Sequence, residues 1–175
     1  MRILIVLVGR TIPGFNELAD KLSRTFKCPV SLELIDFPLT RSFRSERKQY
    51  DAGAFLREMG RFSEPGTKTV FMVREDMFST PLNFVFGLAA ADSCVVATAR
   101  LDPRFYGKVD DGKKAGALFK ERLFKEMMHE LGHTLGMPHC NDKKCVMAFS
   151  NSIADVDHKG AGFCKNCQKA LKIEG

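Results

Sequence analysis

The chain has 175 residues, of which 45% are hydrophobic and 27% charged, a balance typical of one globular domain with a substantial core. No apolar run is long enough to cross a membrane, which excludes a transmembrane protein. The net charge is +6, but the basic residues are scattered apart from short clusters such as 41–48, so we expect neither nucleic acid nor membrane as a partner.

The start of the chain and its six cysteines indicate the compartment. Residues 3–8 are apolar but too few for the hydrophobic part of a secretion signal, and no small-residue cleavage site follows them. A disulfide framework is therefore not expected. Cys28 and Cys94 stand alone among apolar residues and are predicted to be buried free thiols. We expect a protein of the reducing cytoplasm.

The first half of the chain alternates between patterns typical of strands and of helices. Apolar runs or strict alternation predict three strands, at 3–8, 29–37 and 67–73. Apolar residues at helical spacing predict two helices, at 11–26 and 50–62. The basic and polar segment 40–49 is predicted to be a loop.

The second half begins with two strands, at 84–88 and 94–99, that are candidates for a hairpin because no helix separates them. A surface loop is predicted at 102–114. The longest helix is predicted at 115–135, with one broad apolar stripe against the sheet, and a short terminal helix at 166–173. The order of elements predicts an α/β fold with a mixed, mostly parallel, twisted sheet that has one antiparallel edge strand.

The motif H-E-x-x-H-x-x-G-x-x-H runs from His129 to His139. His129 and His133 are four residues apart, so on a helix both imidazoles leave the same face and can bind one Zn²⁺. Gly136 permits a turn with positive φ that would end the helix and bring His139 back as a third ligand. Glu130 lies beside the first ligand, where it can act as general base on a metal-bound water. Three protein ligands and one open position are typical of a catalytic zinc.

Four cysteines follow as C-x4-C and C-x2-C, namely Cys140, Cys145, Cys164 and Cys167. Four thiolates without an open position are typical of a structural zinc, which would replace the core that this apolar-poor segment lacks. Buried free thiols, or a redox pair at Cys164 and Cys167, are the alternatives. We expect two Zn²⁺ per chain, one catalytic and one structural. Because Cys140 adjoins His139, we expect the structural zinc to position that ligand.

The pattern H-C-x4-C-x-M-x16-C-x2-C that starts at His139 resembles the archaemetzincin family of the metzincin clan of zinc peptidases. The similarity extends upstream to 83–87 and 99–101 and so covers most of the chain. The interval between Met147 and Cys164 is one residue shorter than the family's usual pattern, a change that a loop tolerates.

The resemblance implies one metzincin-like catalytic domain over 1–175. Its upper part, 1–136, would hold the sheet and the active-site helix, and its C-terminal part, 137–175, the four-cysteine site. Met147 would be the methionine of the turn beneath the catalytic zinc. Phe149 stands where some metzincins have a tyrosine that assists catalysis.

Metzincins bind extended peptides along an antiparallel edge strand, which implies a substrate-binding edge here. The candidate residues are Phe84, Val85, Phe86 and Gly87, although this run is equally compatible with the interior of the sheet.

The resemblance and the motif together predict a zinc-dependent peptidase that hydrolyses peptide bonds with a zinc-bound water and Glu130 as general base. The alternatives are a catalytically silent zinc scaffold that binds peptides, and a zinc module that binds nucleic acid through basic residues. The silent scaffold would not require Glu130. His158 lies between charged residues and is predicted to be a surface residue.

Overall fold

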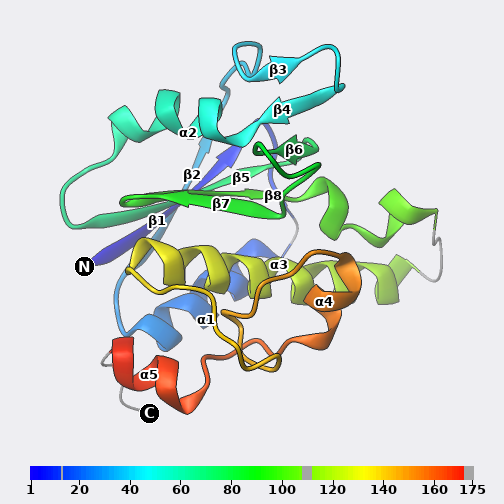
Figure 1. The fold of residues 1–175 in the computed structure, drawn as a ribbon. Coiled ribbons are helices and arrows are strands. Elements are labelled where there is room, and N and C mark those ends of the chain that lie inside the picture. The colour runs from blue at the N-terminus through cyan, green and yellow to red at the C-terminus, as the bar shows by residue number, and fades with distance from the viewer. Residues whose placement is uncertain (13, 108–111, 172–175) are drawn as a thin grey trace.

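A five-stranded sheet in the order β2-β1-β5-β8-β7 forms the centre of the molecule (Figure 1). The computed structural model describes residues 1–12, 14–107 and 112–171. The strands are β1 (Arg2–Val8), β2 (Val30–Ile35), β5 (Thr67–Val73), β7 (Gly87–Ala90) and β8 (Ser93–Ala97). All neighbours pair in parallel except β7, which runs antiparallel to β8 at the edge. The predicted sheet is therefore confirmed.

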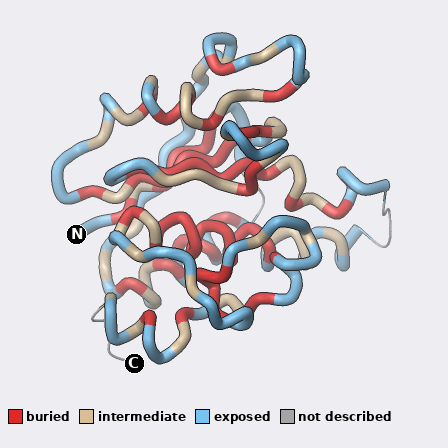
Figure 2. The backbone as a smooth tube through the Cα atoms, viewed as in Figure 1, coloured by how far each residue is buried: buried red, intermediate tan, exposed pale blue. Residues whose placement is uncertain are grey.

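Helices cover both faces of the sheet, and alternate residues of its inner strands pack against them. On one face lie α1 (Phe15–Phe26) and α3 (Gly112–Thr134), and on the other lies α2 (Ala52–Met59) (Figure 1). The inner strands are buried on both sides, which explains their unbroken apolar runs (Figure 2).

Helix α3 corresponds to the longest helix predicted from the sequence, and its apolar stripe is buried as expected. Every residue from 122 to 132 is buried, and the helix packs against β5, β7 and β8. Below it lie the C-terminal helices α4 (Ile153–His158) and α5 (Lys165–Leu171) (Figure 1). No helix in the described part of the chain is long and apolar enough to cross a membrane. The assignment of 1–175 to one domain divided near residue 136 remains a prediction.

The prediction of a loop at 40–49 is confirmed for the turns at 40–42 and 45–48 and wrong for the remaining residues. This segment contains β3 (Phe43–Arg44) and part of β4 (Gln49–Asp51), which form a small second sheet with β6 (Met77–Phe78). These strands are too short for periodicity to reveal them, and β4 pairs with a segment distant in sequence.

Other boundaries differ at places where the local pattern is weak. The strand predicted at 84–88 begins only at Gly87. The residues before it do not continue the pairing with β8, and Val85 instead forms one isolated bridge to Met77. Helix α4 was not predicted, because it has only six residues. It starts with a capping box between Ser152 and Asp155. Helix α2 ends at Met59 and continues as a 3₁₀ turn to Phe62.

The loop predicted at 102–114 contains a 3₁₀ turn at Pro103–Tyr106, and α3 already begins at Gly112. Residues 108–111 of this loop, and residues 172 and 173 of the predicted terminal helix, lie outside the described residues.

Candidate active site and metal centres

The C-terminal part of α3 and the turn after it bring three histidines together. Helix α3 carries His129 and His133, and Gly136 ends the helical course with φ 83°. The Gly136 N–H donates to the carbonyl of His133 (2.9 Å) and the Met137 N–H to that of Gly132 (3.0 Å), a glycine-dependent helix end. The turn returns the chain so that one ring nitrogen of each histidine, His139 included, lies within 4.8 Å of the others.

Two backbone carbonyls determine which ring nitrogens carry hydrogen. His129 Nδ1 lies 2.8 Å from Val146 O, and His133 Nδ1 lies 2.7 Å from Met137 O. A carbonyl only accepts, so each Nδ1 donates and each neutral Nε2 presents a lone pair. The two Nε2 atoms are 3.1 Å apart. Two facing lone pairs at this distance repel unless a cation lies between them, so this pair of histidines fits a metal ion.

The histidines are also held in the neutral form that a metal requires. Burial lowers the pKa of His129 to about 2, and the positive charge of Lys159 acts in the same direction. Burial likewise lowers the pKa values of His133 and His139. At neutral pH all three imidazoles are therefore available as ligands.

Glu130 lies between α3 and β7 with its carboxylate against the backbone of Gly87, in the space that a side chain at position 87 would occupy. The residue is buried, and Oε2 has no hydrogen-bond partner among the described residues. Burial, and then the negative charge of Glu126, raise the pKa of Glu130 well above its ordinary value, while Lys159 lowers it. Glu130 also lines the cleft in front of the histidines.

Met147 packs against α3, the helix that carries His129 and His133, at Gly132. It is fully buried, and its sulfur lies in the space that a side chain at Gly132 would occupy. Gly132 is the residue before His133, so the close approach of Met147 requires a glycine there. The carbonyl of Met147 accepts a hydrogen bond from the Cys140 N–H (2.9 Å), which joins this turn to the residue after His139.

A buried ion pair lies behind the site. Lys159 Nζ is 2.8 Å from Glu126 Oε1, and the two side chains are only 1% and 3% exposed. Glu126 lies one helical turn before Glu130 on α3, and Lys159 follows α4. Arg122 holds α4 in place with two hydrogen bonds of 2.7 Å to the carboxylate of Asp157.

The cleft in front of the histidines is a cavity of about 470 Å³. All four predicted substrate residues line it, namely Phe84, Val85, Phe86 and Gly87. Val85 and Phe86 are, however, only 8% and 4% exposed. Phe149 lies at the opposite wall with its ring 5.1 Å from that of His139.

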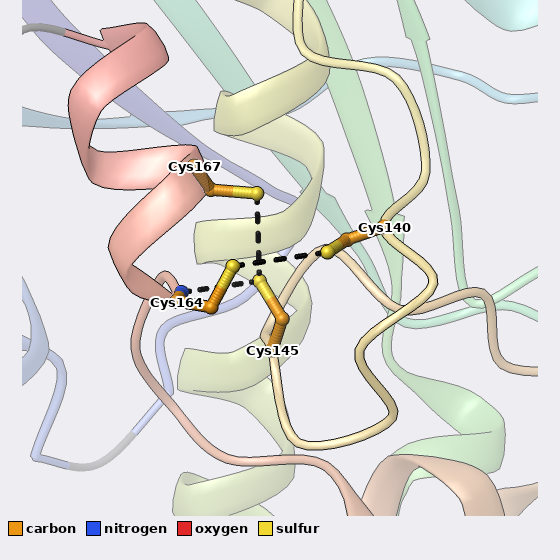
Figure 3. A group of neighbouring side chains, drawn as sticks. All are labelled: Cys140, Cys145, Cys164 and Cys167. Atoms are coloured by element: carbon orange, nitrogen blue, oxygen red, sulfur yellow. Dashed lines mark hydrogen bonds between the residues drawn. The ribbon is translucent and has the colours of Figure 1, made fainter.

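The second centre consists of the four cysteines, whose side chains converge from the loop after α3 and from the start of α5 (Figure 3). The sulfurs of Cys140 and Cys164 are 3.8 Å apart, and those of Cys145 and Cys167 are 3.7 Å apart. These distances are far too long for disulfide bonds. A tetrahedral Zn²⁺ with bonds of about 2.3 Å places its sulfurs about 3.8 Å apart, so the cluster fits the predicted metal.

The remaining candidate ligands lie apart from both centres. His158 is exposed, as predicted. Cys94 is a buried free thiol, whereas Cys28 is only half-buried. Glu126, Gly132 and Lys159 also lie at or behind the site, and the sequence did not predict them there. For Glu126 a signal existed, because it shares a helix face with Glu130 at a spacing of four residues; for Lys159 no local signal exists.

Comparison with known proteins decides the family. The model of peptidase family M54 matches residues 41–173. The archaemetzincin of Saccharolobus solfataricus is 43% identical over 179 residues, which cover 99% of this chain and 93% of that protein. The archaemetzincin of Sulfolobus acidocaldarius is 44% identical over 133 residues, 75% of this chain and 73% of that protein. The chain belongs to peptidase family M54, the archaemetzincins.

Solved structures of the family agree with this fold. The crystal structure of archaemetzincin from Methanopyrus kandleri has a TM-score of 0.82 and 32% identity, and the match covers 98% of this chain and 93% of that one. Archaemetzincin from Archaeoglobus fulgidus, crystallised with malonate, has a TM-score of 0.79 and 31% identity over 97% of this chain and 99% of that one. The resemblance read from the motif is thereby confirmed, and the chain is a zinc metallopeptidase that acts on peptides or proteins.

Proposed function

We propose that this peptidase cleaves peptide bonds at a zinc held by His129, His133 and His139, with Glu130 as general base. The observation that carries the proposal is the distance of 3.1 Å between the Nε2 atoms of His129 and His133. In each ring Nδ1 donates to a backbone carbonyl, so the two Nε2 atoms face each other with their lone pairs. When bound, zinc supplies a Lewis acid that activates water and polarises the scissile carbonyl.

The residues of the chain supply the proton transfers. Glu130 lines the cleft and no described residue holds its carboxylate by a hydrogen bond, so this group can accept a proton from the attacking water and return it to the leaving amine. Burial raises the pKa of Glu130 above that of an exposed carboxyl, which makes this group a stronger proton acceptor when it is ionised.

The substrate would lie along the edge of β7. This strand pairs with β8 on one side only, so its other edge can add an extended peptide as a further strand. Phe84 and Gly87 border the cleft beside this edge, whereas the burial of Val85 and Phe86 suits a supporting role.

The four cysteines would hold a second, structural zinc. The convergence of all four sulfurs, which lie within 4.8 Å of one another, supports this against the alternative of a redox pair at Cys164 and Cys167, since a redox pair needs only two of them. The C-terminal segment has few buried apolar residues, so the metal would stabilise its fold.

The test is zinc content per chain together with cleavage of a mixture of peptides. We expect two zinc ions in the wild type, two in Glu130→Gln without cleavage, and one in His133→Ala. His158→Ala and Glu121→Gln, which change the same residue types outside the site, are expected to keep both zinc ions and the activity. If the wild type holds both zinc ions but Glu130→Gln cleaves as fast as the wild type, Glu130 is not the base. Full zinc without cleavage by any variant would favour the silent peptide-binding scaffold.

A further inference from the structure

A second cavity, of about 690 Å³, lies at the end of the sheet where the parallel strands terminate. Its wall is formed by residues that follow three strands, Thr11 and Ile12 after β1, Arg74 after β5 and Thr98 after β8. The first turns of α3 complete it. The histidines lie on the same helix more than two turns further on, so this cavity is separate from the peptidase cleft.

The topology of the sheet singles out this place. From β1 the chain passes over one face to β2, and then over the other face to β5 on the opposite side of β1. The connection that leaves β1 and the connection that enters β5 therefore lie on opposite faces of the sheet, and the chain changes direction between these two neighbouring strands (Figure 1). In open α/β sheets, small ligands bind outside the carboxyl ends of the strands at this switch point.

A hydroxyl on the wall, that of Thr98, lacks a hydrogen-bond partner among the described residues. Thr98 is 4% exposed, its N–H donates to Val73 O (2.8 Å), and its carbonyl accepts from the Leu101 N–H (3.1 Å). Its side-chain oxygen, however, forms no hydrogen bond with any residue that the structure describes. Because Thr98 lines the cavity, this unpaired hydroxyl is available to a ligand that supplies an acceptor or a donor.

The charge on the wall is positive and partly uncompensated. Arg74 is exposed and forms no hydrogen bond or ion pair within the described part of the chain. Arg104, by contrast, is held by the carboxylate of Asp102. Lys120 Nζ lies 3.4 Å from Glu17 Oε2, and because both side chains are partly exposed this ion pair is weak. The charge of Arg74 lies near the Asp102 carboxylate, whose pKa it lowers, but no hydrogen bond or ion pair holds the guanidinium within the described residues. This guanidinium can therefore turn to an anion in the cavity, and a guanidinium binds phosphate well.

Apolar rings line the rest of the wall. Phe105 is 46% exposed and Phe119 is half-buried, and both border the cavity. An anion with an aromatic body would cover this apolar surface while its charged group reached Arg74 and Thr98.

We propose that this cavity binds a small organic phosphate, with the phosphoryl oxygens at Arg74 and Thr98 and an apolar or aromatic body against Phe105 and Phe119. The inference does not depend on peptidase activity, and binding alone tests it.

The experiment titrates phenyl phosphate into the zinc-loaded protein by calorimetry, with inorganic phosphate and neutral phenol for comparison. We expect phenyl phosphate to bind best, phosphate more weakly and phenol least. Arg74→Gln and Thr98→Val are each expected to weaken binding about 10-fold, the effect of one lost charge-assisted hydrogen bond. Thr98→Val is expected to melt no lower than the wild type, because it removes only an unpartnered hydroxyl.

Two controls distinguish this site from others. Arg24→Gln removes the same charge from an exposed position of α1 and is expected to bind normally. His133→Ala alters the zinc site and is also expected to bind normally. The proposal is overturned if the wild type does not bind phenyl phosphate, if Arg74→Gln and Thr98→Val bind as tightly as the wild type, or if only His133→Ala abolishes binding.

Discussion

The carboxylate of Glu130 occupies the space in which a side chain at Gly87 would stand. Helix and edge strand therefore approach each other closely at the point where the proposed base borders the cleft. If Glu130 is the general base, a side chain at position 87 is therefore expected to disturb catalysis by displacing that carboxylate.

Replacing Gly87 by alanine tests this relationship. The added methyl group would displace the Glu130 carboxylate, and a shift of about 1 Å in a catalytic group costs on the order of 100-fold in rate. We expect kcat to fall by about that factor while both zinc ions remain bound. Gly60→Ala is the matched control, since a methyl group there meets nothing within 4 Å and the local φ of −60° suits alanine. Normal kcat in Gly87→Ala would show that the contact is unimportant.

The buried pair Glu126–Lys159 makes a prediction about stability. Lys159→Met would leave the Glu126 carboxylate buried without its partner, which costs about 3–5 kcal/mol of unfolding free energy. Glu126→Leu combined with Lys159→Met removes both charges and is expected to recover most of that loss. Urea denaturation of the zinc-loaded variants measures both values. Equal stability of the single and the double variant would contradict the account.

The pKa values of the histidines predict how the catalytic zinc responds to acid. Protons compete with the metal only below the pKa of the metal-free imidazole, and burial lowers that of His129 from its ordinary value of about 6.5 to about 2. Protonation of His129 therefore competes with zinc only at much lower pH and is nearly absent at about pH 5.5. We expect the catalytic zinc to be retained there, as measured with a colorimetric chelator. A catalytic-zinc affinity that falls steeply between about pH 7 and about pH 5.5 would show that the imidazoles titrate as exposed ones do.

The two metal centres are joined through a short backbone link, since Cys140 follows His139 and donates to Met147 O. Cys164→Ser is expected to lose the structural zinc and, as a consequence, to weaken the catalytic zinc by about 10-fold or more. Zinc affinity and peptide cleavage measure the effect. Cys28→Ser, a change outside both clusters, is expected to alter neither. Unchanged catalytic zinc affinity and activity in Cys164→Ser would show that the sites are not coupled.

The local parts of the molecule could be predicted from the sequence, because their physical causes act over a few residues. The spacing of four places His129 and His133 on one helix face, and Gly136 supplies the positive φ that ends the helix. Apolar runs such as 67–73 predict inner strands because burial on both faces requires apolar residues throughout.

Only the tertiary structure decided which distant residues meet. Gly87 and Glu130, like Glu126 and Lys159, are far apart in sequence, and no periodicity within either segment records their contact. The small second sheet was missed for the same reason. The cavity beside Thr98 exists because the crossover from β2 to β5 sets three strand ends side by side. Periodicity determines which face of an element is buried, whereas the packing of the whole chain determines which side chains that face meets.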